Sequence, residues 1–243
     1  MKFIKSLICN YLCINNLKNY NFPKHYYSIK KIKKIYYENN IYYDIYRDNI
    51  NFIIEDNIPN NYKKYNSLTA EHIFPQSYTK NYKKAKLDMH NIFLTQSLLN
   101  CNRSNYKFSD ENKESYKDLY LLNYKNYKNY KNYKNYKNYK NYKNYKNYKN
   151  YKNYKNYKNN QKRIFIPYSQ SRGLIARSLA YMDYTYDNLD LYNVIDIDLL
   201  IKWNLEYPPT IIEKKQNKII GHYQGNLNMF IDNYKLIDFI YNI

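Results

Sequence analysis

The chain has 243 residues and a formal net charge of +20 at pH 7, a balance typical of proteins that bind nucleic acid over a broad surface. The location of the charge excludes that class. Residues 1–37 hold eight lysines and residues 123–158 hold twelve, with no acid in either segment, so these two segments account for the whole net charge. The rest of the chain is close to neutral and needs a specific site to attract phosphate.

Residues 1–37 have the pattern of a targeting leader. A short, weakly apolar stretch comes first, and a Lys/Asn-rich segment without acids follows. This order is similar to the two-part leaders of secondary plastids, and import into a mitochondrion or entry into the secretory pathway are the alternatives. An AT-rich coding bias, which fills an unconstrained terminus with Lys, Asn and Tyr, explains the same composition without a targeting role.

Cysteine content and hydropathy exclude two further classes. The cysteines are Cys9, Cys13 and Cys101, so no disulfide framework can be drawn for the core, and no Cys/His zinc pattern is present. The apolar runs are shorter than the roughly 20 residues that a membrane helix needs. We therefore expect a soluble protein without a membrane partner, and a monomer.

Residues 38–122 carry a strand–loop–strand–helix pattern. The apolar pair at residues 73–74 indicates a short strand, which Pro75 ends because proline cannot continue a ladder. The apolar run at residues 92–94 predicts a second strand. Residues 96–100 have the pattern of the first turn of a helix.

Three side chains in this pattern have the chemistry that phosphodiester hydrolysis requires, namely a base and ligands for a hard cation. His72, on the first strand, can take the proton of a water, whereas Glu71 and the Asn100 amide, on the helix, suit Mg²⁺. Neighbouring strand residues point to opposite faces unless the strand bends or ends, which weakens the pairing of Glu71 with His72. A lone histidine is also more often a surface or core residue, so spacing alone leaves the nuclease interpretation open.

Residues 123–158 repeat the triplet Asn-Tyr-Lys twelve times. The triplet has no apolar face at the period of a helix or a strand. Interleaved Lys and Tyr can neutralise phosphates and stack on single-stranded bases. A tract tolerated in a surface loop is the simpler explanation, because closure entropy grows only logarithmically with loop length. We interpret the tract as a low-complexity insertion that divides one domain into residues 38–122 and 159–243.

The second block, residues 159–243, predicts a helical half. Ile175, Leu179 and Met182 fall at helical spacing, which is typical of a core-facing helix. The sequence Thr210-Ile211-Ile212-Glu213 has the pattern of a capping box at the start of another helix. Helices of this kind would provide one wall of the groove that presents a nucleic-acid strand to His72.

Separated motifs in both blocks resemble the bacterial endonuclease I family of secreted and periplasmic His-Me finger nucleases. They follow one another in the family's order, at residues 71–77, 88–91, 100–106, 173–182 and 202–232. The resemblance implies an α+β fold in which a ββα-metal (His-Me finger) nuclease domain has a helical C-terminal half. It also implies hydrolysis of DNA, and often of RNA, with little sequence preference and with 5′-phosphate products.

The resemblance also implies roles for individual residues. His72 falls on the general base, and Glu71 and Asn100 fall on the ligands of Mg²⁺, for which Mn²⁺ or Ca²⁺ could substitute. Arg103 and Arg177 fall within matching motifs, where an arginine either contacts phosphate or fastens the finger to neighbouring helices.

Asp88, His90 and Asn91 fall beside the expected site, where their hydrogen bonds would brace the finger. The chain departs from the family at Tyr78, where Trp is common, and in the last motif. Between the first two motifs, where some members place a phosphate-contacting arginine, the chain offers only Lys80, Lys83, Lys84 and Lys86. These departures leave the three expected catalytic residues intact.

The sequence therefore predicts a metal-dependent, sequence-tolerant endonuclease that acts on DNA, with RNA as an alternative substrate. The alternative is a catalytically inactive nucleic-acid-binding protein that keeps the same fold and uses the basic repeat to hold its ligand. A structural or surface protein with Tyr-rich repeats is a third class, and it predicts no metal dependence.

Overall fold

The computed structural model describes residues 32–33, 35–38, 41–46, 68–79, 83–110, 164–187 and 189–242. Nearly all of them belong to one compact unit, which consists of residues 1–109 and 164–243, and a second unit comprises residues 110–163. The Asn-Tyr-Lys repeat and residues 1–31 of the expected leader lie outside the described residues. The first unit mixes helices and strands with small sheets, as an α+β class requires.

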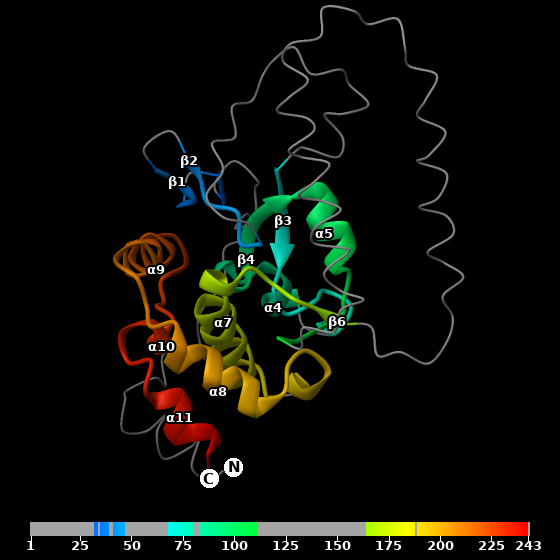
Figure 1. Cartoon of the computed structure of the whole chain (residues 1–243). Coiled ribbons are helices and arrows are strands. Elements are labelled where there is room, and N and C mark those ends of the chain that lie inside the picture. Colours follow the sequence, from blue (N-terminus) through cyan, green and yellow to red (C-terminus); the bar gives the residue numbers. More distant parts are fainter. Residues whose placement is uncertain are drawn as a thin grey trace, which may run out of the picture. The chain divides into compact units, whose positions relative to one another are not determined.

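The strands pair two by two (Figure 1). They are β1 (Tyr37–Glu38) with β2 (Ile41–Tyr42), β3 (Leu68–His72) with β4 (Ile92–Gln96), both antiparallel, and β5 (Lys107–Phe108) with β6 (Ile164–Phe165), which are parallel. The helices are α4 (Lys83–Leu87), α5 (Ser97–Arg103), α7 (Arg172–Thr185), α8 (Ile197–Glu206), α9 (Ile211–Gln224), α10 (Met229–Asp232) and α11 (Leu236–Tyr241), with short 3₁₀ turns that include η2 (Met89–Asn91).

Strands β3 and β4 pair with each other, and helix α5 packs on both; these three elements are hereafter the finger. The strand predicted at residues 92–94 is confirmed as β4, every residue of which is buried. The predicted helix is confirmed as α5, which begins directly after β4 and packs on both strands. The first predicted strand, which carries His72, corresponds to β3, but its extent is wrong: β3 ends at His72, and residues 73–74 form a bend.

The bend after β3 is held by the side chain of Asn91. Its Oδ1 accepts a hydrogen bond from the Phe74 N–H (2.7 Å), and its Nδ2 donates to the Phe74 carbonyl (3.1 Å). The backbone groups of Phe74, which a longer strand would use in its ladder, are therefore satisfied by a side chain. The apolar composition of residues 73–74 gives no indication that the Asn91 side chain binds this backbone.

The segment before the finger packs into the core. Ile32, Ile35 and Tyr36 are buried, and the Tyr36 hydroxyl donates to the carbonyl of Ile92 (3.2 Å). Further along, the Ile45 N–H donates to the carbonyl of Leu94 (2.9 Å). Part of the segment that the sequence assigns to the leader thus contributes to the core of the described unit.

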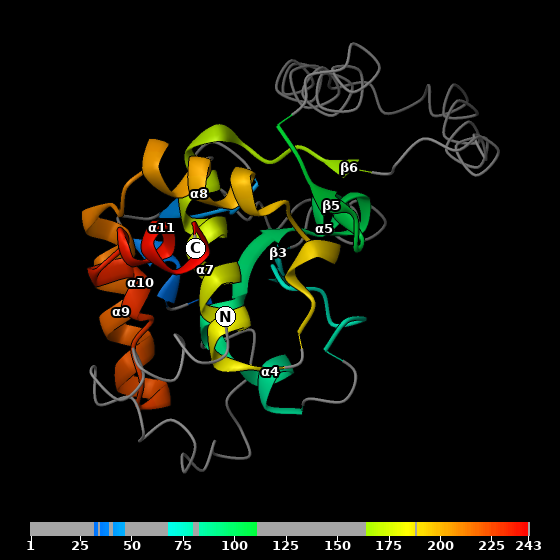
Figure 2. The ribbon, with the colours of Figure 1, turned by 90° about the horizontal axis from the view of Figure 1, so that it is seen from below.

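Helix α7 lies at the centre of the helical half and contacts η2, α8 and α10 (Figures 1 and 2). Ile175, Leu179 and Met182 are fully buried, as their helical spacing predicts. Gly173 allows a close crossing, since a Cβ there would lie 2.0 Å from the carbonyl oxygen of Tyr207. No helix in the described ranges has the length and apolarity needed to span a bilayer.

Helix α9 begins at the predicted cap. The Thr210 Oγ1 accepts a hydrogen bond from the Glu213 N–H (3.1 Å), which is one half of a capping box. The Glu213 carboxylate does not supply the other half, because it binds the Arg177 guanidinium through both oxygens, at 2.6 Å each. The Glu213 carboxylate therefore binds the Arg177 guanidinium and not the backbone N–H of Thr210 that a full capping box predicts.

Candidate active site

Helix α5 brings Asn100 and Arg103 onto one face of β3. Thr69 and Glu71 share that face because they are two residues apart in a strand, and Asn100 and Arg103 share a helix face because they are three apart. The Asn100 Nδ2 donates to Thr69 Oγ1 (3.1 Å) and to the carbonyl of Ala70 (3.0 Å). One turn later, the Arg103 Nη1 lies 3.4 Å from Glu71 Oε1. The Asn100 amide and the Glu71 carboxylate therefore both lie between β3 and α5.

The Glu71 carboxyl is almost completely buried, at 3% exposure. Burial raises its pKa to about 7, and the nearby Arg103 guanidinium and the hydroxyl of Tyr46 oppose part of this rise. The Tyr46 hydroxyl donates to Glu71 Oε1 at 2.8 Å. Near neutral pH this carboxyl is therefore poised between its two protonation states, and a cation beside it would favour the charged form.

His72 ends β3, and its ring faces the segment that leads to α4. Its Nε2 lies 3.0 Å from the carbonyl oxygen of Lys86, which can only accept, so this nitrogen carries the proton and Nδ1 carries the lone pair. The amide nitrogen of Gln76 lies 3.1 Å from both ring nitrogens. Burial lowers the pKa of His72, and the charges of Arg103 and Lys86 add to this effect. The ring is thus held as a neutral base.

Arg103 is 1% exposed and fastens the end of β3 to α5. Its Nη1 donates to the carbonyl of His72 (3.3 Å) and its Nη2 to that of Ile73 (2.6 Å). The guanidinium carbon lies 4.7 Å from the centre of the Phe108 ring. These contacts tie the guanidinium to the backbone of the finger itself.

Arg177, on α7, belongs to a different cluster. Besides its two bonds to Glu213, its Nη1 donates to Asn204 Oδ1 (3.2 Å) and to the carbonyl of Tyr207 (2.9 Å). Within the described part of the chain, these guanidinium contacts reach α8, α9 and the loop between them. The structure therefore does not bring Arg177 to Glu71, His72 and Asn100.

Asp88 joins the finger to the helical half through a fully buried carboxylate. Its Oδ1 accepts from the His90 N–H and from Gln224 Nε2, both at 2.9 Å. Its Oδ2 accepts from the hydroxyls of Tyr181 (2.9 Å) and Tyr186 (2.8 Å). Four donors from three parts of the chain thus compensate for the loss of water around this charge.

His90 and Asn91 lie in the same 3₁₀ turn, η2, and hold it on both sides. The His90 Nε2 lies 2.9 Å from the carbonyl oxygen of Asn226, and the His90 carbonyl accepts from the hydroxyl of Ser178 (2.8 Å). Burial lowers the pKa of His90. Asn91 holds the bend at Phe74, so the residues expected to brace the finger do connect it to its surroundings.

The Glu71 and Asn100 oxygens suit a hard cation. The two hydrogen bonds of the Asn100 side chain use its nitrogen, which leaves its oxygen available as a ligand. The described ranges hold no group of three or more His, Cys, Asp or Glu side chains placed to share a metal ion. Glu71 and Asn100 are a different type of pair, and Mg²⁺ binds through one or two such oxygens while it keeps several waters.

The sequence motifs do not indicate the contacts of two other residues at the site, Tyr46 and Gln76. Tyr46 is one of 37 tyrosines and precedes the finger by more than 20 positions. Gln76 lies inside a matching motif, but nothing in the motif indicates that its amide faces the His72 ring. Only the folded arrangement reveals these two neighbours.

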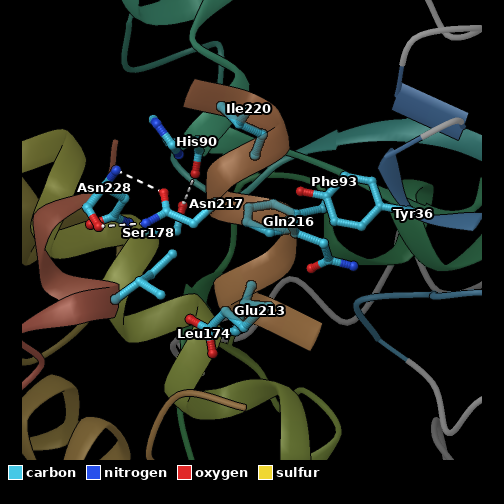
Figure 3. A pocket seen from close by; sticks show the side chains of 11 residues that line it. Tyr36, His90, Phe93, Leu174, Ser178, Glu213, Gln216, Asn217, Ile220 and Asn228 are labelled. Atoms are coloured by element: carbon cyan, nitrogen blue, oxygen red, sulfur yellow. Dashed lines mark hydrogen bonds between the residues drawn. The ribbon is translucent and has the colours of Figure 1, made fainter. Parts of the chain in front are cut away.

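A cavity elsewhere in the unit is too small for a substrate. It has a volume of about 20 Å³ and is lined by side chains that include His90, Ser178, Asn217 and Asn228 (Figure 3). This volume accommodates roughly one water molecule among polar partners. Glu71, His72 and Asn100 are not among its lining residues.

Comparison with known proteins identifies the family. No curated protein matches the chain. The sequence model described as Endonuclease I matches residues 2–235, which is nearly the whole chain and includes both blocks around the repeat. The resemblance seen in the separated motifs is thereby confirmed. Since the match extends far beyond the finger and includes the helical half, the protein belongs to the endonuclease I family.

Proposed function

We propose that the protein is a metal-dependent endonuclease whose active centre consists of Glu71, His72 and Asn100. Membership of a nuclease family supports a hydrolase that acts on nucleic acids. The observation that carries the proposal is that α5 places the Asn100 amide against β3, the strand that bears Glu71 and His72. The finger is then a ββα-metal finger in function as well as in topology.

His72 acts as the general base. The Lys86 carbonyl holds the proton on Nε2, so Nδ1 is the atom that accepts a proton from the attacking water, which must take the place of the Gln76 amide nitrogen 3.1 Å from Nδ1. The low pKa of the buried ring keeps it neutral before the reaction. When the ring becomes charged, the Lys86 carbonyl stabilises the imidazolium through the same hydrogen bond.

Glu71 and Asn100 hold the cation through a carboxylate and an amide oxygen. When bound, Mg²⁺ would neutralise charge on the scissile phosphate and on the leaving 3′-oxygen. The contribution of the protein is mainly placement. Arg103 locks β3 to α5, and the Asn100 nitrogen is anchored on Thr69 and Ala70, so both ligands are fixed before the substrate arrives.

The surroundings of His72 support a substrate with a phosphate backbone. Helix α4 carries Lys83, Lys84 and Lys86, and the Lys86 carbonyl contacts the His72 ring. Lys83 and Lys84 are exposed. Contacts to phosphate carry no sequence information, so such a surface suits cleavage of DNA and RNA with little sequence preference, to 5′-phosphate products.

The test uses the full chain with a labelled plasmid and a single-stranded RNA, in Mg²⁺ and in EDTA. His72→Ala should lower the cleavage rate by at least about 100-fold, because general-base catalysis contributes that much or more. His222→Ala is the matched control, because His222 is an exposed histidine on α9. Its rate should stay within about twofold of wild type, as expected for a surface substitution.

Cleavage that needs both the metal and His72 would establish the reaction class. A folded, pure protein that binds both substrates and cuts neither would contradict the enzyme proposal. That outcome would favour the inactive nucleic-acid-binding protein as the function of this chain.

A further inference from the structure

Tyr46 reaches the site from a part of the chain that the family motifs do not include. It is 2% exposed, and its ring centre lies 4.7 Å from that of Phe165 and 6.4 Å from that of Phe108. Its hydroxyl donates to Glu71 Oε1 at 2.8 Å. The ring is therefore fixed by packing, and its polar end contacts the carboxylate of the proposed site.

The backbone of Tyr46 is also fixed, by the carboxylate of Asp44. Asp44 Oδ1 accepts from the Tyr46 N–H (2.8 Å) and from the hydroxyl of Thr95 (2.7 Å), and its Oδ2 accepts from the Gln96 N–H (2.9 Å). Thr95 and Gln96 end β4, immediately before α5. Residues 44–46 are thus fastened to the junction that positions the helix bearing Asn100.

A buried tyrosine hydroxyl needs an acceptor, and a backbone carbonyl is sufficient. Tyr36 illustrates this, since its hydroxyl donates to the carbonyl of Ile92. Tyr46 instead contacts the carboxylate that is expected to bind the cation, on the same oxygen, Oε1, that Arg103 approaches. Hydrogen bonds of this kind orient metal ligands and commonly change metal affinity.

We infer that Tyr46 is a positioning residue, whose hydroxyl holds the Glu71 carboxylate in the orientation that binds the cation. The inference rests on the proposed function. Tyr46 and Arg103 both contact Oε1, so two contacts restrain the same oxygen of the carboxylate. The segment around Tyr46 therefore completes the site, although it lies outside the finger.

The test compares Tyr46→Phe with Tyr36→Phe in the full chain. Each change removes one buried hydroxyl and keeps the ring, so Tyr36→Phe controls for a general loss of stability. The first measurement is calorimetric binding of Mn²⁺ alone, without substrate. Tyr46→Phe should raise the Kd for Mn²⁺ by about 10- to 100-fold. Tyr36→Phe should leave the Kd within about twofold of wild type, because its hydroxyl contacts only the backbone of β4.

The second measurement is the Mg²⁺ dependence of cleavage. For Tyr46→Phe, the Mg²⁺ concentration that gives half-maximal rate should rise by the same factor as the Kd, and saturating Mg²⁺ should restore kcat. A merely structural defect would instead lower the free energy of unfolding in EDTA, which urea unfolding measures, and Tyr36→Phe would show a similar loss.

Thr95→Val provides a second variant, should Tyr46→Phe fail to fold. It removes a hydroxyl that anchors Asp44 and leaves Tyr46 and Glu71 intact, so Mn²⁺ binding should weaken in the same direction by a smaller factor. If the wild-type protein binds Mn²⁺ and cuts, and both variants bind Mn²⁺ with wild-type affinity, the role of Tyr46 is overturned and the proposed function is not. A wild-type protein that neither binds Mn²⁺ nor cuts overturns the proposed function itself.

Discussion

Two buried arginine–glutamate pairs, one in the finger and one in the helical half, use the same two side chains in different ways. In the helical half, Arg177 meets both oxygens of Glu213 at 2.6 Å. In the finger, Arg103 lies 3.4 Å from a single oxygen of Glu71 and donates to backbone carbonyls instead. A closed pair of this kind holds helices together, whereas an open pair leaves a carboxylate able to bind a further cation.

The sharpest way to test this contrast is the same substitution in both pairs. Glu213→Gln leaves the buried Arg177 charge uncompensated and should lower the free energy of unfolding by about 3 kcal/mol or more. Glu71→Gln removes a proposed metal ligand and should lower the cleavage rate by about 100-fold or more, in the range seen when a metal site is disturbed. Urea unfolding and plasmid cleavage measure the two effects.

The expected outcome is a crossed pattern. Folded Glu213→Gln should still cut, and Glu71→Gln should remain folded because Arg103 keeps its bonds to the carbonyls of His72 and Ile73. The contrast between an open and a closed pair fails if Glu71→Gln cuts at the wild-type rate, or if Glu213→Gln is as stable as wild type.

The pH dependence of the metal-free protein sharpens the comparison. The folded-state pKa of Glu71, about 7, is raised above its ordinary value of 4.5, so the folded state binds this proton more tightly than the unfolded state. The resulting stability is fully present below about pH 4.5 and is lost as pH rises through about 7. A shift of this size corresponds to roughly 2–4 kcal/mol.

The measurement is urea unfolding of wild type and Glu71→Gln in EDTA between pH 4.5 and 8. The difference between the two curves should follow the titration of Glu71, because contributions from other groups cancel. Mg²⁺ should restore part of the stability that wild type loses at high pH and should not do so in Glu71→Gln. A difference that is constant with pH would show that this carboxyl is ionised throughout.

A third carboxylate, Asp88, shows the effect of burial on stability without the effect of an arginine partner. It has no arginine among the partners described above and is held by four hydrogen bonds from neutral donors. Asp88→Asn places an N–H where only acceptors fit, and it should cost about 1–3 kcal/mol in unfolding free energy. The control is Asp190→Asn, because Asp190 is an exposed cap residue that accepts from the Tyr192 N–H. Asp190→Asn should change the stability by less than about 1 kcal/mol.

The sequence points to the proposed catalytic residues more directly than to the residues that support them. Glu71, His72 and Asn100 lie in short motifs, and the strand and helix that bear them follow from apolar runs and their order. The contacts of Tyr46 and the partner of Glu213 depend on segments that meet only after folding. The composition adds to the difficulty, because the sequence around Tyr46 does not distinguish it from the many other tyrosines.

The misplaced strand at residues 73–74 has the same cause. Apolar residues there are typical of a strand, and Ile73 and Phe74 are indeed fully buried. The Asn91 side chain, however, satisfies the Phe74 backbone, and the ladder stops at His72. The burial of these two residues is predictable from composition. Whether they extend the strand or form a bend depends on the Asn91 side-chain amide, which is distant in the sequence.

The smallest expected effect concerns the repeat, residues 123–158, which lies outside the described residues and carries twelve of the lysines. The contacts assigned to the proposed site come from the finger and from residues 44, 46, 73, 76, 86, 108 and 165. Replacing the repeat with a short Gly/Ser loop should therefore keep cleavage within about threefold and cost little stability, because closure entropy changes slowly with loop length. The change should mainly reduce the salt dependence of substrate binding, since fewer lysines would release counterions from phosphate. Binding and cleavage measured across a salt series show whether the repeat only binds substrate or also forms part of the active site. Loss of cleavage at low salt would place part of the active site in the repeat. Retained cleavage would confine the active site to the finger and the residues that support it.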